Sequence, residues 1–127
     1  MKYLSNYIDE PLTKLFKECG AFYAFSSTQF EEKRRDGTKY IDCKNGLICE
    51  EQHVPKLING MHEIIEEGRK QDLKENGKEA IILRELLNHE CFYTSYPDDA
   101  IEALEGYNFT EQEIRKIFKD NWHKYGV

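Results

Sequence analysis

The chain has 127 residues, a formal net charge of −6, and 39% hydrophobic and 13% aromatic residues. This length fits one domain with a real core, and so many aromatic side chains exclude a disordered chain. No apolar run is long enough to span a bilayer, and Met1–Asn6 holds no signal-peptide core. We therefore expect a single cytoplasmic domain over residues 1–127, with its four Cys as reduced thiols.

The N-terminal half begins with one helix and one strand. Residues 11–19 are predicted to form a helix, with Asp9 as its cap and Pro11 in its first turn. Gly20 ends this helix. Ala21–Phe25 is then typical of a short buried strand.

A second helix and a hairpin are predicted to follow. Ser26 with Gln29 three residues later is a capping box, which indicates a short helix to about Arg35. Asn45-Gly46 is a strong hairpin signal between two apolar segments. The strands of this hairpin are predicted at residues 38–43 and 47–49.

The C-terminal half is predicted to be helical. A 3-4 apolar spacing starts at Pro55 and fades over residues 68–75, and a more buried helix covers residues 78–91. Phe92–Pro97 is predicted as an aromatic loop or short strand, and a short helix follows it to Gly106. Thr110 caps a last helix whose inward side chains are Ile114, Ile117, Phe118, Trp122 and Tyr125. The predicted class is α+β, with an antiparallel sheet of about three strands packed against four to six helices.

The negative charge is concentrated late in the chain. Residues 1–60 hold nine basic and nine acidic side chains, whereas residues 61–127 hold nine and fifteen. No Lys or Arg occurs between Glu85 and Ile114. We interpret the acids of the predicted helix and of the start of the last helix as one partner-binding surface: Asp98, Asp99, Glu102, Glu105, Glu111 and Glu113. This sign favours a protein partner with a basic surface and argues against direct nucleic-acid binding.

A second candidate is a polar cluster on the helix of residues 78–91. Glu85, Asn88 and His89 share one helix face, and Glu90 lies about a quarter-turn away. A Glu and a His one turn apart can bind a divalent metal ion or act as an acid/base pair. A structural hydrogen bond between them explains the same spacing. No complete catalytic motif accompanies them, so no catalytic residue and no cofactor is predicted.

Two segments carry a resemblance. Ala21–Phe30 matches an AFxAFSxxQF pattern, and Arg84–Glu90 matches an RELxNHE pattern. In this order they resemble a family of small uncharacterised proteins of bacteria, phages and plasmids. The resemblance implies a mobile-element context and brings no activity, cofactor or catalytic residue.

Three functional hypotheses remain open. The leading one is a non-enzymatic binding protein that inhibits a host defence or nucleic-acid-handling factor through the acidic surface. The second is a metal-dependent enzyme or metal-regulated protein that uses Glu85 and His89. The third is a nucleotide or small-ligand sponge with a pocket lined by Tyr23, Phe25, Tyr93 and Tyr96.

Overall fold

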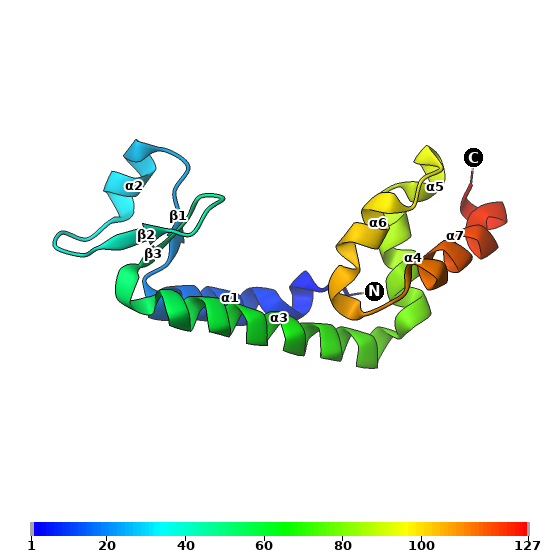
Figure 1. The fold of residues 1–127 in the computed structure, drawn as a ribbon, viewed down its shortest axis with the longest axis horizontal. Coiled ribbons are helices and arrows are strands. Elements are labelled where there is room, and N and C mark those ends of the chain that lie inside the picture. The colour runs from blue at the N-terminus through cyan, green and yellow to red at the C-terminus, as the bar shows by residue number, and fades with distance from the viewer. Residues whose placement is uncertain (1, 127) are drawn as a thin grey trace. The chain divides into compact units, whose positions relative to one another are not determined.

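The computed structural model describes residues 2–126 and confirms the α+β class (Figure 1). Its contacts divide the chain into two compact units. The sheet unit is Ser5–Glu67, and the helical unit combines Met1–Leu4 with Gly68–Val127, of which residues 1 and 127 lie outside the described part. Each unit has a hydrophobic core of its own. The prediction of one domain over the whole chain stays a prediction.

The three predicted strands form one antiparallel sheet in the order β1-β3-β2. The strands are β1 (Phe22–Tyr23), β2 (Tyr40–Asp42) and β3 (Leu47–Glu50). The predicted hairpin joins β2 to β3, and its turn places both Asn45 and Gly46 at positive φ. The prediction of a buried first strand was wrong, because β1 has two residues and Phe25 beyond it is 73% exposed.

Helix α1 (Ser5–Cys19) begins earlier than predicted. Asp9 is not its cap but an internal residue, whose backbone oxygen accepts a hydrogen bond from the Thr13 hydroxyl (2.9 Å). Pro11 also lies inside the helix. Proline has no N–H to donate, so α1 tolerates one missing backbone hydrogen bond near its middle.

Helix α2 (Ser27–Lys33) has the predicted cap. The Ser26 hydroxyl accepts from the backbone N–H of Gln29 (3.2 Å). The Gln29 side chain reaches one residue further back than a capping box requires and accepts from the N–H of Phe25 (2.7 Å). The cap thus fixes the chain direction between β1 and α2.

The long helix α3 (Val54–Asn76) follows a short 3-10 turn, η1 (Glu51–His53). The predicted fading over residues 68–75 was wrong, because the helix continues to Asn76 and buries Asp72 completely. Gly77, at φ 83°, ends it as predicted, and α4 (Lys78–Asn88) starts at the next residue. Leu57 of α3 belongs to the core of the sheet unit, whereas Asp72 lies in the helical unit.

Four further elements complete the helical unit. They are α5 (Cys91–Thr94), α6 (Asp98–Ala103), η2 (Glu105–Tyr107) and α7 (Glu111–Tyr125). The predicted aromatic loop or strand at residues 92–97 is wrong in its first part, which forms α5. Thr110 caps α7 as predicted, accepting from the N–H of Glu113 (3.1 Å).

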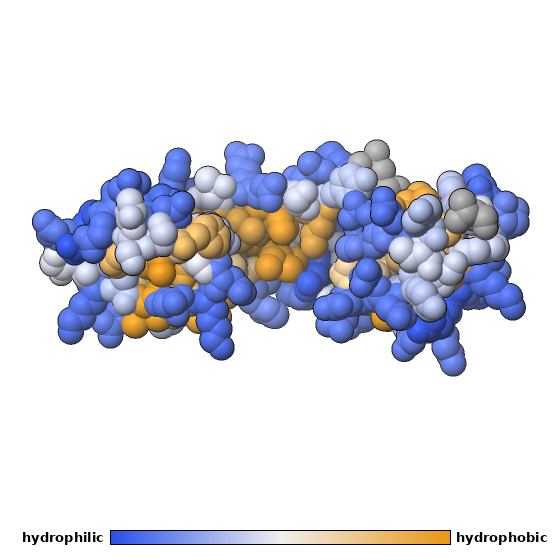
Figure 2. Space-filling view, turned by 90° about the horizontal axis from the view of Figure 1, so that it is seen from above, coloured by the Kyte–Doolittle hydropathy of each residue, from blue (hydrophilic) through white to orange (hydrophobic). Residues whose placement is uncertain are grey.

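The two cores differ in make-up. The core of the helical unit has eight buried members: Ile81, Ile82, Leu86, Cys91, Phe92, Ala100, Leu104 and Ile114. The predicted inward side chains of α7 belong to this core or pack against it. The core of the sheet unit comprises Leu15, Cys19, Leu47, Cys49 and Leu57. Figure 2 shows hydrophobic side chains gathered over the region of α1 and α3.

Candidate functional sites

A buried polar network lies inside the helical unit, where the sequence predicted no site. Asp72 is fully buried, and its two carboxylate oxygens accept from the two terminal nitrogens of Arg84 (2.9 and 3.0 Å). The Tyr107 hydroxyl donates to Asp72 Oδ2 (2.5 Å), and the Asn76 amide donates to Oδ1 (2.7 Å). Bidentate Arg–carboxylate pairs are among the strong interactions between side chains.

The same Arg84 reaches the beginning of the chain. Its Nη1 donates to the backbone oxygen of Lys2 (3.1 Å), and its guanidinium lies 5.6 Å from the centre of the Tyr3 ring. Its Nε donates to Glu85 Oε1 (3.0 Å). Arg84 therefore joins α3, α4 and the N-terminal residues of the helical unit.

The fold shifts the pKa values of Asp72 and Tyr107 further from neutral pH. Burial raises the pKa of Asp72, but the hydrogen bonds from Arg84, Tyr107 and Asn76 outweigh it, so the pKa is lowered overall. Burial and the hydrogen bond to Asp72 raise the pKa of Tyr107. A general acid or base works best when its pKa lies near the working pH. The network is therefore suited to holding the fold and not to transferring protons.

The predicted polar cluster lies at the edge of this network. His89 Nε2 is 3.4 Å from Glu85 Oε2, so the predicted face-sharing pair exists, but the other oxygen of Glu85 is held by Arg84. Asn88 and Glu90 are exposed, and Glu90 takes a left-handed backbone conformation at the start of α5. Within residues 2–126, no three His, Cys, Asp or Glu side chains are arranged to hold a metal ion. A metal at Glu85 and His89 would need further ligands and stays a prediction.

The predicted acidic surface is split by its ion pairs. Arg115 of α7 contacts Asp98 (3.3 Å) and Glu111 (2.8 Å), and Lys78 pairs with Glu113. The hydrogen bond from Lys78 lowers the pKa of Glu113. Cations from outside the Lys/Arg-free stretch thus neutralise half of the predicted acids. The other three are exposed and have no ion-pair partner among the described residues: Asp99, Glu102 and Glu105.

The four aromatic residues of the predicted ligand pocket belong to different units. Tyr23 and Phe25 stack on each other in the sheet unit, with ring centres 6.0 Å apart and planes 7° apart. Tyr93 and Tyr96 belong to the helical unit and are 75% and 69% exposed. The four residues thus do not belong to one compact unit.

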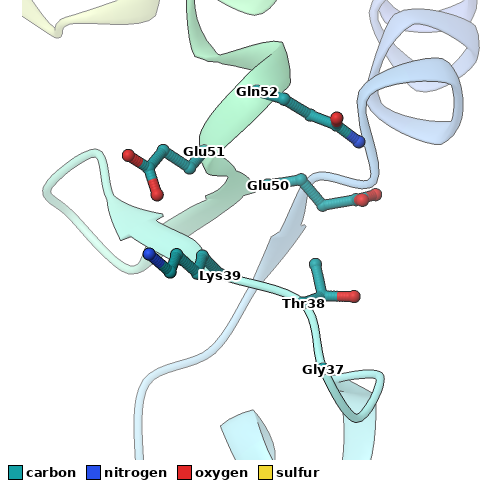
Figure 3. A pocket seen from close by; sticks show the side chains of 6 residues that line it. All are labelled: Gly37, Thr38, Lys39, Glu50, Glu51 and Gln52. Carbon is teal, nitrogen blue, oxygen red and sulfur yellow. The ribbon is translucent and has the colours of Figure 1, made fainter.

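A polar cleft of about 550 Å³ opens in the sheet unit (Figure 3). Its lining residues come from the loop before β2 and from the junction of β3 with η1: Gly37, Thr38, Lys39, Glu50, Glu51 and Gln52. Figure 3 shows Glu50 and Gln52 extending to one side, and Glu51 and the Lys39 amine to the other. Because these side chains diverge, the cleft does not focus several groups on one point.

Three of the four thiols are buried. Cys19, Cys49 and Cys91 are fully buried, and Cys43 is half-buried. Burial raises the pKa of Cys49 to about 11 and also raises the pKa of Cys19 and Cys91. A thiol with such a pKa is an unreactive core residue.

These pKa values predict selective alkylation. At pH 8 a thiol of pKa about 11 is ionised in only about one molecule in a thousand. We expect iodoacetamide to modify Cys43 first in the folded protein, and Cys49 at least about tenfold more slowly than in denaturant. Mass spectrometry of timed samples measures both rates. Equal rates for Cys49 in the folded and unfolded chain would contradict the buried assignment.

Comparison with known proteins identifies a family. A model described as a family of unknown function (DUF7659) matches residues 4–124, so the chain belongs to this family. No curated protein and no solved structure is detectably similar to the chain. No helix within residues 2–126 has the length and apolar character needed to cross a membrane.

Proposed function

We propose that the chain is a non-enzymatic binding protein that docks onto a basic protein surface through Asp99, Glu102 and Glu105. The observation that supports the proposal is the difference in pairing among the acids of this region. Asp98 and Glu111 share Arg115, and Glu113 has Lys78, but these three have no cation within residues 2–126. Exposed charges that the fold leaves unpaired are free to meet charges of a partner.

The backbone presents these acids outward. Ala100 and Leu104 are buried in the core of the helical unit, which turns the opposite face of α6 and η2 to the solvent. Asp99, Glu102 and Glu105 follow one another at three-residue spacing along this exposed side. The core thus anchors the segment, and the unpaired carboxylates line its accessible side.

A charged surface of this kind mainly increases the rate at which the two proteins associate. Complementary charges speed association and exclude partners of the wrong sign, and salt screens them beyond about 10 Å at 0.1 M. We therefore expect the partner interaction to weaken as salt is added. The mobile-element context and a host factor as the target belong to the same proposal and derive from the resemblance, and the cytoplasmic location stays a prediction.

The test neutralises the three acids without adding bulk. In the variant Asp99→Asn, Glu102→Gln, Glu105→Gln we expect the partner Kd to rise about tenfold at low salt, because three attractive charges are lost. Partners are first captured from host lysate with the wild-type chain, and Kd is then measured with each purified partner. Circular dichroism checks that the variant is folded.

A matched control removes the same charge elsewhere. Glu10, Glu32 and Glu63 are exposed acids of the sheet unit, and Glu10→Gln, Glu32→Gln, Glu63→Gln should leave Kd within about twofold. An unchanged Kd in the first triple variant would reject the proposed surface. An equal loss in both variants would show that net charge, and not this surface, drives capture.

A further inference from the structure

Another hollow in the sheet unit, of about 240 Å³, is lined by three cations and by Glu50. Lys17 comes from the last turn of α1, Lys33 from the last turn of α2, and Arg35 from the loop that follows. The remaining walls are aromatic or backbone: Phe16, Gly20, Ala21, Phe22 and Tyr40. A chain of net charge −6 thus builds one pocket whose charged side chains are three cations and one carboxylate.

The pocket is rich in hydrogen-bond donors. Lysine offers three N–H groups and arginine five. Lys33 uses one of its donors on the backbone oxygen of Tyr23 (2.6 Å), and Arg35 Nη2 uses one on Glu50 Oε2 (2.8 Å). The side-chain amine of Lys17 has no hydrogen-bond or ion-pair partner in the described part of the chain. Most donors of the pocket are therefore unused, and its single side-chain carboxylate is already engaged.

Glu50 fixes the position of Arg35. The Glu50 side chain is 8% exposed, whereas that of Arg35 is 70% exposed. Gly20 packs directly on the carboxylate, since a Cβ at this position would lie 1.6 Å from Glu50 Oε2. The backbone N–H of Arg35 also donates to the Tyr40 hydroxyl (3.0 Å). A held guanidinium loses less conformational entropy when it binds an anion.

The helix ends do not cancel this positive charge. Lys17 and Lys33 lie in last turns, where cations offset the negative end of the helix dipole. Each helix end is equivalent to roughly half a negative charge. Two such ends leave about one positive charge after the Arg35–Glu50 pair is counted as neutral.

We propose that this pocket binds a small phosphate monoester, with its phosphate at Lys17, Lys33 and Arg35 and a planar ring against the aromatic wall. A phosphate group suits this pocket because its oxygens are negatively charged and can accept hydrogen bonds from the unused N–H donors. One water, with a single non-hydrogen atom, occupies about 30 Å³ of liquid, so a phosphate with its five non-hydrogen atoms fills roughly 150 Å³. The hollow of about 240 Å³ therefore has room for more than a phosphate alone. The rings of Phe16, Phe22 and Tyr40 favour an aryl or nucleoside group in the remaining space.

The test is a titration of the ¹⁵N-labelled full chain followed by NMR. The probes are inorganic phosphate, phenyl phosphate, uridine monophosphate and, as a probe without phosphate, benzyl alcohol. We expect the monoesters to shift the amide signals around Lys17, Lys33 and Arg35, and to bind more tightly than inorganic phosphate. Tighter binding of uridine monophosphate than of phenyl phosphate assigns a nucleotide, and the reverse order assigns an aryl phosphate.

Matched variants locate the binding. Lys17→Gln and Arg35→Gln should each raise Kd about fivefold or more, because each removes a charge-assisted hydrogen bond. Lys44→Gln is the control, since Lys44 is exposed on the hairpin and does not line the pocket. Where Lys17→Gln disturbs the spectrum of the free chain, Lys33→Gln replaces it. No shifts with any phosphate probe up to about 10 mM would overturn the proposal, as would equal weakening by Lys44→Gln.

Discussion

Asp72→Ala is expected to lower the free energy of unfolding of the helical unit by about 3–5 kcal/mol. The change leaves the Arg84 guanidinium, whose side chain is 3% exposed, without its main counter-charge. It also removes the acceptor of the Tyr107 hydroxyl and of the Asn76 amide. Buried donors without acceptors retain the full cost of losing water. Urea denaturation followed by circular dichroism measures the loss.

An exposed pair provides the control for this variant. Lys116 and Asp120 form an i,i+4 ion pair at 2.7 Å, with both side chains more than half exposed. Asp120→Ala should therefore cost no more than about 1 kcal/mol. If Asp72→Ala cost as little as Asp120→Ala, the buried network would not stabilise the helical unit.

The same variant should change the response to acid. The folded pKa of Asp72 lies below its ordinary value of 3.8, so its contribution to stability is present above that value and is lost as the pH falls through the folded pKa. Wild type should therefore lose stability more steeply than Asp72→Ala below about pH 4. Parallel pH profiles for the two proteins would contradict the lowered pKa.

Leu86→Ala is expected to destabilise the helical unit by about 2–5 kcal/mol. Leu86 is fully buried among the side chains of α4, α5, α6 and α7, so truncation leaves a cavity that close-packed neighbours fill poorly. The next residue is a matched control, because Leu87 is 44% exposed. Leu87→Ala should cost about 1 kcal/mol or less. Similar losses at both positions would contradict the assigned helix face.

Local signals predicted most of the elements. Ser26 and Thr110 were recognised as caps because their hydroxyls act on an N–H three residues away, which is visible in the sequence. Asn45-Gly46 was recognised because its turn needs positive φ. The sequence does not indicate the early start of α1, because proline favours the first turn of a helix, whereas Pro11 lies further inside α1.

The sequence did not predict the buried polar network, because its residues are far apart along the chain. Asp72 pairs with Arg84 twelve residues later and with Tyr107 thirty-five residues later, and no local pattern contains such contacts. One signal was present. Asp72 continues the 3-4 spacing of Leu57, Met61, Ile64 and Gly68 along α3, where a buried carboxylate requires a partner.

The distribution of charge along the sequence also differs from its distribution in the folded structure. The stretch from Glu85 to Ile114 has no Lys or Arg, yet Arg115 and Lys78 fold onto its acids. Glu85 is likewise held by Arg84, the residue just before the stretch. The candidate partner surface therefore narrows from six acids to three.

The helical unit combines segments that lie before and after Ser5–Glu67 in the sequence, and this sets an order for folding during synthesis. Ser5–Glu67 is continuous, so the ribosome delivers all of the sheet unit before the helical unit is complete. The backbone oxygen of Lys2 must wait for Arg84, which is translated 82 residues later. We expect the segment around Lys2 to reach its final contacts only after Arg84 has been made.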